Sequence, residues 1–169
     1  MNPEQKAAVE VAENLHSIEE FERDVEPAIV AARNEFLTQE TIIGLFENDF
    51  INELYPDDSP LYRLISRTYI FVETDIGRIR DVYDAKLKPL GFTLSEKRDS
   101  DKVQFLWTNA SYSASVDVIT HVGIQSSTSY SAGPLRSDGS SENPSVFLPL
   151  EGRVPEWLTP ELTEKYREQ

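Results

Sequence analysis

The hydrophobic pattern of residues 3–37 is that of an amphipathic helix. Apolar residues recur there at steps of three, four or seven, which is typical of one helical face. These residues are Val11, Leu15, Ile18, Val25, Ile29, Ala32 and Phe36. Glu22 takes the one position in this stripe that is not apolar, and Pro27 interrupts it. Because proline lacks a backbone N–H and clashes with the preceding turn, we predict a kink or break there, with Asp24 capping the second piece.

A third helix is predicted over residues 41–54, because large apolar residues repeat there every four positions. They are Ile42, Phe46, Phe50 and Leu54. Residues 55–60 hold two prolines around a pair of aspartates. That composition predicts a loop that ends the helix.

After residue 60 the pattern becomes that of strands around a single helix. Asp75 is suited to cap a helix over residues 76–88, which ends at Lys88-Pro89-Leu90-Gly91. Alternating or β-branched and aromatic residues predict strands over 67–73, 92–97, 103–108, 114–122 and 124–130, with a turn at 99–101. Short connections make the later strands antiparallel neighbours.

The predicted fold class is therefore α+β, with N-terminal helices packed on an antiparallel-rich β-α-β-β-β sheet in two layers. We expect a single domain, made of an acidic helical region (1–58), a β-α-β meander (62–130), a mobile loop (131–145) and a C-terminal extension (146–169). The loop is rich in Ser, Gly, Pro and Asn, with too few apolar groups to offset its ordering entropy. The extension is predicted to hold a short strand at 146–148, an apolar anchor at Trp157 and Leu158, and a short helix after Thr159.

The net charge of −14, from 30 acidic and 16 basic side chains, is concentrated in one segment. Residues 1–58 hold 15 of the acids and 3 of the bases, a net of −12. A charge run of this kind is usually a solvated helical face. The alternative is an acidic surface aimed at a basic partner. In either case the charge repels phosphate, so we expect no nucleic-acid binding.

Few residues offer catalytic chemistry. The absence of cysteine excludes disulfides, thiolate nucleophiles and Cys-based metal sites. The two histidines, His16 and His121, do not have the spacing of metal ligands, and no cofactor is expected. Both are interpreted as structural or exposed. A hydrolase would instead require His121 to meet a serine or carboxylate.

Binding candidates come from the aromatic and basic residues of the second half. Trp107, Tyr112, His121 and Tyr130 would serve if the sheet face left uncovered by the 76–88 helix exposes them. Arg78 and Arg80 lie on that helix, in a basic stripe with Lys86 and Lys88. The stripe is interpreted as a source of solubility or as a partner of the acidic helices, the alternative being a small anion site.

The order of elements over about residues 62–132 resembles a known family. A helix closes on Leu87-Lys-Pro-Leu-Gly-Phe92, Thr-Leu-Ser-Glu follows, and an aromatic strand precedes Ala114-Ser-Val-Asp-Val-Ile119. This is similar to small uncharacterised lipoproteins of actinobacterial cell envelopes, in which a helix ends on Leu-x-x-Gly-Phe or Gly-Trp before a strand meander. The resemblance implies an extracytoplasmic location, through a leader and lipidated cysteine that we expect upstream of Asn2. It implies no activity.

Three functions follow from these observations. The first is a non-catalytic binding or structural module of the cell envelope, with a protein or small-molecule ligand that the sequence leaves open. The second is a cytoplasmic acidic interaction protein, such as an immunity protein, that binds a basic partner. The third is a hydrolase using His121. The longest apolar runs, such as residues 69–72, are too short to span a membrane, and the oligomeric state is not indicated.

Overall fold

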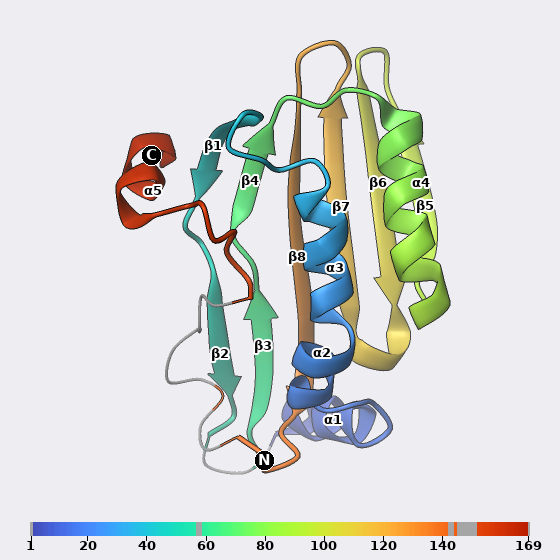
Figure 1. Ribbon diagram of the computed structural model, residues 1–169. Coiled ribbons are helices and arrows are strands. Elements are labelled where there is room, and N and C mark those ends of the chain that lie inside the picture. Colours follow the sequence, from blue (N-terminus) through green and yellow to red (C-terminus); the bar gives the residue numbers. More distant parts are fainter. Residues whose placement is uncertain (1, 57–58, 142–143, 145–151, 169) are drawn as a thin grey trace.

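The computed structural model describes residues 2–56, 59–141, 144 and 152–168. Helices and a single antiparallel sheet form the two predicted layers, which confirms the α+β fold class (Figure 1). The helices are α1 (Pro3–Glu13), α2 (Ile18–Asp24), α3 (Glu26–Asn34), α4 (Ile76–Leu87) and α5 (Pro160–Tyr166), with 3-10 turns at Lys88–Leu90 and Ala110–Tyr112. None of the helices in this part of the chain has the length and apolar character needed to cross a bilayer.

Within the described residues, the sheet has eight strands in the order β1-β4-β8-β7-β6-β5, with β2 paired to β3 and β3 to β8. The strands are β1 (Ile42–Phe46), β2 (Phe50–Leu54), β3 (Leu61–Ile65), β4 (Thr68–Phe71), β5 (Thr93–Arg98), β6 (Lys102–Asn109), β7 (Ala114–His121) and β8 (Gln125–Arg136). The long β8 is central: β7 pairs along one edge, and β4 and β3 share the other. The predicted β-α-β-β-β order is thus present as β4-α4-β5-β6-β7, followed by β8.

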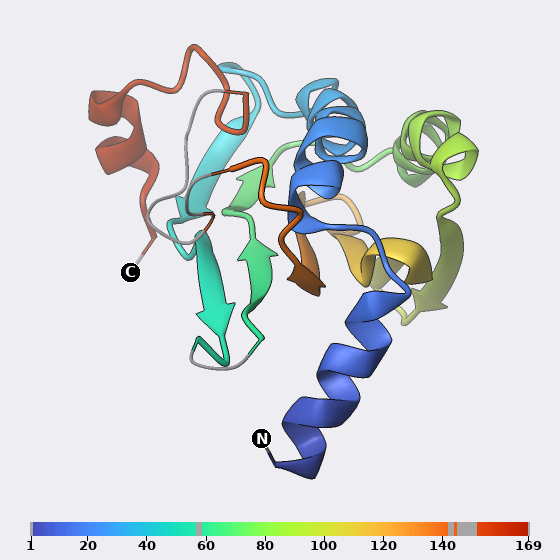
Figure 2. The same ribbon diagram turned by 90° about the horizontal axis from the view of Figure 1, so that it is seen from below.

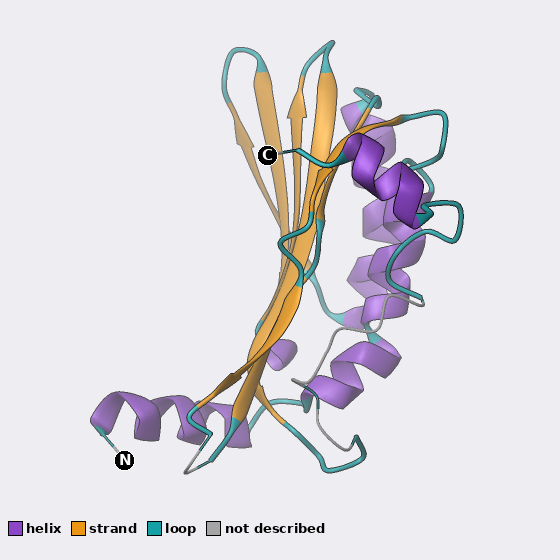
Figure 3. Ribbon diagram, turned by 90° about the vertical axis from the view of Figure 1, so that its left-hand side faces the viewer, coloured by secondary structure: helices purple, strands orange, loops and turns teal. Residues whose placement is uncertain are grey.

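Helices α2 to α5 lie on one side of the sheet, and α1 stands apart from them at one end (Figures 2 and 3). The core fills the space between the sheet and these helices. A stack of buried rings joins α3, α4 and β6 there: Tyr83 lies 6.1 Å from Phe36 and 5.0 Å from Trp107 between ring centroids. Asp75 caps α4 by accepting from the N–H of Arg78, as predicted. The predicted anchor and helix start are also confirmed, since Leu158 is buried and Thr159 caps α5.

The N-terminal helical stripe is broken twice rather than once. The first break precedes Ser17, which forms a reciprocal capping box with Glu20: the Ser17 Oγ accepts from Glu20 N at 3.1 Å, and Ser17 N donates to Glu20 Oε1. The second break falls at Val25. Pro27 lies in the first turn of α3, where its missing N–H has no partner to lose. The prediction that Asp24 caps this piece is wrong, because its carboxylate pairs with Arg23.

The helix predicted over 41–54 is wrong, because this segment forms β1 and β2. A repeat of four residues is also a multiple of two, so it fits one face of a strand as well as a helix. A β-bulge between Ile42 and Gly44 further shifts the alternation, leaving Ile42 7% exposed and Phe46 39% exposed. The sequence repeat therefore joins residues that the structure places on opposite faces.

The loop predicted over 131–145 is wrong at its start, since residues 131–136 complete β8 and pair with β3. Gly133 is required within this segment. Its φ is +105°, and a Cβ there would lie 2.3 Å from the carbonyl oxygen of Tyr62. Residues 142, 143 and 145 of the predicted loop, and the predicted strand at 146–148, lie outside the described residues.

Residues 137–141 make three hydrogen bonds to one buried carboxylate. Glu19 of α2 accepts hydrogen bonds from Ser137 Oγ at 2.7 Å, Asp138 N at 3.0 Å and Ser141 Oγ at 3.2 Å. Polar contacts, rather than apolar burial, therefore hold this segment. The composition of the segment gave no sign of such a partner.

Candidate ligand-binding site

The structure does not bring the two histidines together. His16, between α1 and α2, bonds Glu20 Oε2 through Nδ1 at 2.7 Å and stacks on Tyr112 at 4.3 Å. His121 is exposed at the far end of β7. Tyr112 lies just before β7 begins, so the length of this strand, roughly 25 Å, separates the two histidines. Within the described residues, no serine or carboxylate side chain hydrogen-bonds to His121, and no cluster of three metal-ligating groups is found.

The aromatic candidates face the helices rather than the uncovered side of the sheet. Trp107, Tyr112 and Tyr130 are all buried. The Trp107 indole donates to Asp84 Oδ1 of α4 at 2.8 Å. The expectation that they line an exposed sheet face is therefore wrong, because alternation along β6 and β8 directs Trp107 and Tyr130 inward. Of the three, Tyr130 lines a cavity.

Basic side chains of the α4 stripe form ion pairs with acidic residues that are near them in sequence. Arg78 donates to Glu73 at 2.9 Å, Arg80 to Asp81 at 3.3 Å, and Lys88 lies 3.2 Å from Asp84. Arg78 also lies over the ring of Phe36. No ion pair between this stripe and the acidic helices is present in the described part of the chain.

Some of the acidic residues of the first third lie inside the protein. Arg153 donates through Nε to Glu26 Oε2 at 2.7 Å and also pairs with Glu22, the residue that interrupts the apolar stripe. Tyr130 donates its hydroxyl to the same Glu26 oxygen. Burial raises the pKa of Glu22, and the Arg153 guanidinium opposes that shift. The solvated-face interpretation is thus wrong for Glu19, Glu22 and Glu26, which bind other parts of the chain.

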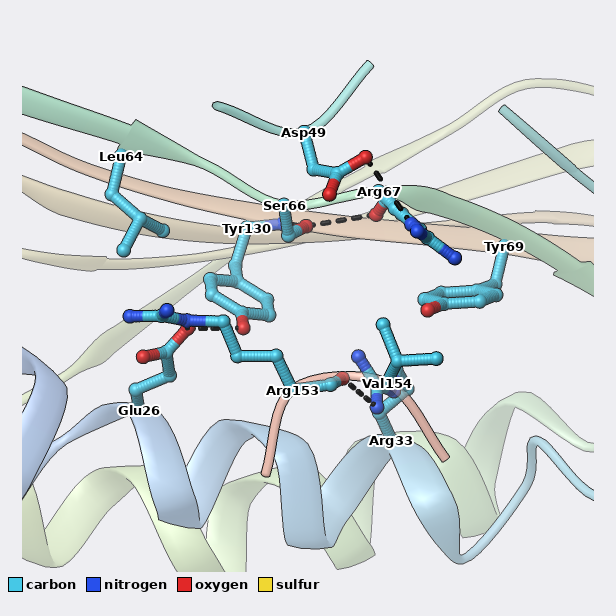
Figure 4. A pocket seen from close by; sticks show the side chains of 10 residues that line it. All are labelled: Glu26, Arg33, Asp49, Leu64, Ser66, Arg67, Tyr69, Tyr130, Arg153 and Val154. Carbon is cyan, nitrogen blue, oxygen red and sulfur yellow. Dashed lines mark hydrogen bonds and ion pairs between the residues drawn. The ribbon is translucent and has the colours of Figure 1, made fainter. Parts of the chain in front are cut away.

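Three nearly buried guanidinium groups surround one small cavity between α3 and the sheet (Figure 4). Arg33 comes from α3, Arg67 from the start of β4 and Arg153 from the C-terminal segment, with 3%, 8% and 9% exposed. The free volume of the cavity is about 10 Å³, roughly what one water molecule needs. Tyr69 and Tyr130 also line it. Burial raises the pKa of both phenols, so both remain protonated at neutral pH.

The three arginines differ in their partners. Arg153 has two carboxylates, and Arg67 lies 3.2 Å from Asp49 and 3.5 Å from Glu47. Arg33 has only neutral acceptors among the described residues. Its Nη2 donates to the backbone oxygen of Arg153 at 2.6 Å, and its Nε donates to the Asn34 side chain at 3.1 Å. Its guanidinium also lies over the Tyr69 ring at 4.8 Å.

A larger groove of about 390 Å³ lies next to this cavity and opens at the surface. Its walls are mainly apolar and come from the C-terminal segment: Val154, Pro155, Leu158 and Pro160. Arg67, Arg167 and Glu47 are among its polar groups, and Glu47 accepts from Arg167. Residues 167 and 168 run beside β1, where Glu168 N donates to the Leu45 carbonyl at 2.8 Å. Arg67 and Val154 line both the groove and the cavity.

The sequence interpretation missed these site residues. Arg33 was detectable, because it stands between Ile29 and Phe36 on the apolar face of its helix. A charged residue on such a face is rarely buried without a partner. Arg153 and Arg167 gave no comparable signal, since their partners lie 120 or more residues away in sequence.

A family model described as a domain of unknown function (DUF4853) matches residues 14–143. The chain belongs to this DUF4853 family. The matched region runs from the end of α1 past β8, so it includes Arg33 and Arg67 and ends before Arg153 and α5. No curated protein matches the chain.

The fold of this DUF4853 chain is similar to a solved structure, the crystal structure of a DUF4853 family protein from Actinomyces odontolyticus. The two share 16% sequence identity with a TM-score of 0.54, over 82% of this chain and 80% of that one. At this identity the likeness shows a common fold. The predicted resemblance is thereby supported for an actinobacterial family, without bearing on lipidation or the envelope.

Proposed function

We propose that this DUF4853 protein is a non-catalytic binding module whose ligand site is the groove formed by Arg67, residues 154–158 and α5. The observation that carries the proposal is the make-up of that groove. Small-ligand sites are typically concave, mostly apolar and about 300–1,000 Å³ in volume, with a few fixed polar groups. The groove has this size, four apolar wall residues and two guanidinium groups.

The polar groups at the base of the groove are held in place before any ligand arrives. Arg67 is nearly buried and is oriented by Asp49 and Glu47. Leu158 is packed into the core and fixes the opposite wall. A preorganised site loses less conformational entropy on binding than a flexible one, which favours a ligand-binding role.

The location that we propose is the cell envelope, and the support for it is the sequence resemblance over residues 62–132. A leader and lipidated cysteine encoded upstream of Asn2 would support this location. Fractionation of native cells, together with the intact mass of the native N-terminus, tests it. Recovery in the cytoplasmic fraction, with translation beginning at Met1, would contradict it.

Binding in the groove is testable with a fragment library followed by ¹H–¹⁵N NMR. We expect bound fragments to shift the amide resonances of residues 154–158 and 160–167. Glu156 is an exposed residue that lines the groove, so Glu156→Trp should block it without disturbing the core. Glu161→Trp, also exposed and on α5 but outside the groove lining, is the matched control. Fragments whose binding survives Glu156→Trp, or a library that never perturbs the groove, would refute the proposal.

A further inference from the structure

We infer that the ligand of this groove carries a carboxylate, and that Arg33 and Arg67 bind it where the groove meets the buried cavity. This inference deepens the proposed function and rests on it. It begins from the unequal pairing of the guanidinium groups around the cavity. Arg33, Arg67 and Arg153 line the cavity together with the carboxylates of Glu26 and Asp49.

Arg33 is the guanidinium group that has no carboxylate partner among the described residues. Each of the other two arginines has a carboxylate from the cavity lining and a second one from the outer side, Glu47 or Glu22. Arg33 is the most deeply buried of the three and has no carboxylate among the described residues. A buried cation is costly unless an anion compensates it. A monoanion bound beside Arg33 would supply the carboxylate partner that this guanidinium lacks.

The donors around the cavity suit a carboxylate. A guanidinium presents a planar fork of N–H groups that matches the two oxygens of a carboxylate. Arg33, Arg67 and the protonated phenol of Tyr69 offer donors on this side, while the Glu26 and Asp49 carboxylates are already engaged by Arg153, Tyr130 and Arg67. A neutral amide in the same place would direct its own N–H groups at these donors.

Val154 and Arg67 line both the cavity and the groove, so they mark where the two spaces meet. In Figure 4 the Val154 side chain lies beside Arg33, between α3 and the sheet. The cavity in this structure holds about one water molecule, so a carboxylate enters only when the Val154 side chain moves aside. Val154 is half-buried, so a shorter side chain there should ease entry.

Octanoate and octanamide are the probes, because they have the same chain and differ in charge at the head group. We expect octanoate to bind wild-type protein at least tenfold more tightly than octanamide, measured by NMR titration. Arg33→Met should remove this preference, and Val154→Ala should strengthen octanoate binding. Arg80→Met is the matched control, since the Arg80 side chain on α4 is 42% exposed and this substitution removes the same charge. It should leave both affinities unchanged.

Should Arg33→Met fail to fold, the wild-type protein still provides a test. The Arg33 Nε–H resonance should shift when octanoate is added and stay in place with octanamide. Equal binding of both probes in the groove, or an unmoved Arg33 signal, would overturn the inference while leaving the proposed function intact. The inference would also fall if no carboxylate, from acetate to decanoate, perturbed Arg33 or Arg67. The fragment-library experiment with Glu156→Trp tests separately whether the groove binds any ligand.

Discussion

Arg153 and Glu26 are 127 residues apart in sequence, yet the Arg153 Nε donates to Glu26 Oε2 at 2.7 Å. This bond ties the C-terminal segment to the first turn of α3. The same oxygen accepts the hydroxyl of Tyr130 from the central strand. One carboxylate therefore joins a helix, the sheet and the tail of the described chain.

Arg153→Met should destabilise the protein by about 3–5 kcal/mol, because it leaves Glu26 buried without its cation. Chemical denaturation with urea measures the loss. Adding Glu26→Gln to the variant should recover part of it, since the uncompensated charge is then gone. Arg80→Met, at an exposed site, should cost less than about 0.5 kcal/mol. A cost for Arg153→Met as small as this control would contradict the structural role of the pair.

Asp117→Asn should stabilise the protein at neutral pH. Asp117 lies half-buried on β7 and accepts from Gln104 Nε2 at 3.1 Å. Burial raises its pKa above the ordinary 3.8, so the folded state holds this proton more tightly than the unfolded state. Stability is then lost as pH rises from 3.8 through the folded-state pKa, and asparagine avoids this loss.

The gain from Asp117→Asn at pH 7 should appear as a higher Tm, because the ionised carboxylate is no longer buried. It should shrink as pH falls through 3.8, where the carboxyl group becomes protonated in both states. Thermal unfolding at pH 7 and pH 3.5 checks both parts. Asp81→Asn, at an exposed helix position, is the control. A gain that persists at pH 3.5 would have a cause other than this titration.

Glu19→Ala should release residues 137–141, because it removes the acceptor for three of their hydrogen bonds. The nearby Arg136 offers a trypsin site at the end of β8. We expect cleavage there to become several-fold faster under limited proteolysis. Glu10→Ala, at an exposed position of α1, should leave the cleavage rate unchanged.

Gly133→Ala and Gly123→Ala separate two costs of replacing glycine. Both positions have positive φ, +105° and +78°, which costs about 1 kcal/mol for alanine. A Cβ at Gly123 meets nothing within 4 Å, whereas one at Gly133 lies 2.3 Å from the Tyr62 carbonyl oxygen. Gly133→Ala should therefore lose clearly more stability in urea than Gly123→Ala. Equal losses would mean that the backbone around Tyr62 can move away.

The sequence predicts the second half of this fold well because its signals are local. Asp75 as a cap, Gly91 as a helix end and the alternation along β6 each depend on neighbouring residues. The helix prediction for the segment 42–54 was wrong because a four-residue spacing does not distinguish helix from strand. Asn48 and Asp49 in its middle are turn-type residues, and they lie between β1 and β2, which pair with different strands, β4 and β3.

The candidate site depends on pairing that no local signal specifies. Glu22 stands out in its apolar stripe, yet nothing near it in sequence identifies Arg153 as its partner. The net charge of residues 1–58 does not indicate which acidic side chains are paired inside the protein. It counts Glu26, which is buried, in the same way as Glu10, which is exposed. The useful clue was a charged residue at a position where the apolar pattern predicts a core side chain. Glu22 occupies such a position, and so does Arg33.

The central place of β8 also determines when this protein can fold. The β5-β6-β7 meander and the β1–β4 pair are joined in one sheet only through β8, residues 125–136. The β2–β3 pair also joins the sheet through β8, so among the described strands a nascent chain that has emerged only to residue 124 has three separate groups: β1–β4, β2–β3 and β5–β6–β7. Its Glu22 and Glu26 carboxylates also lack their partner Arg153 at that stage. Its tertiary structure must therefore assemble after most of its length has left the ribosome, rather than progressively from the N-terminus.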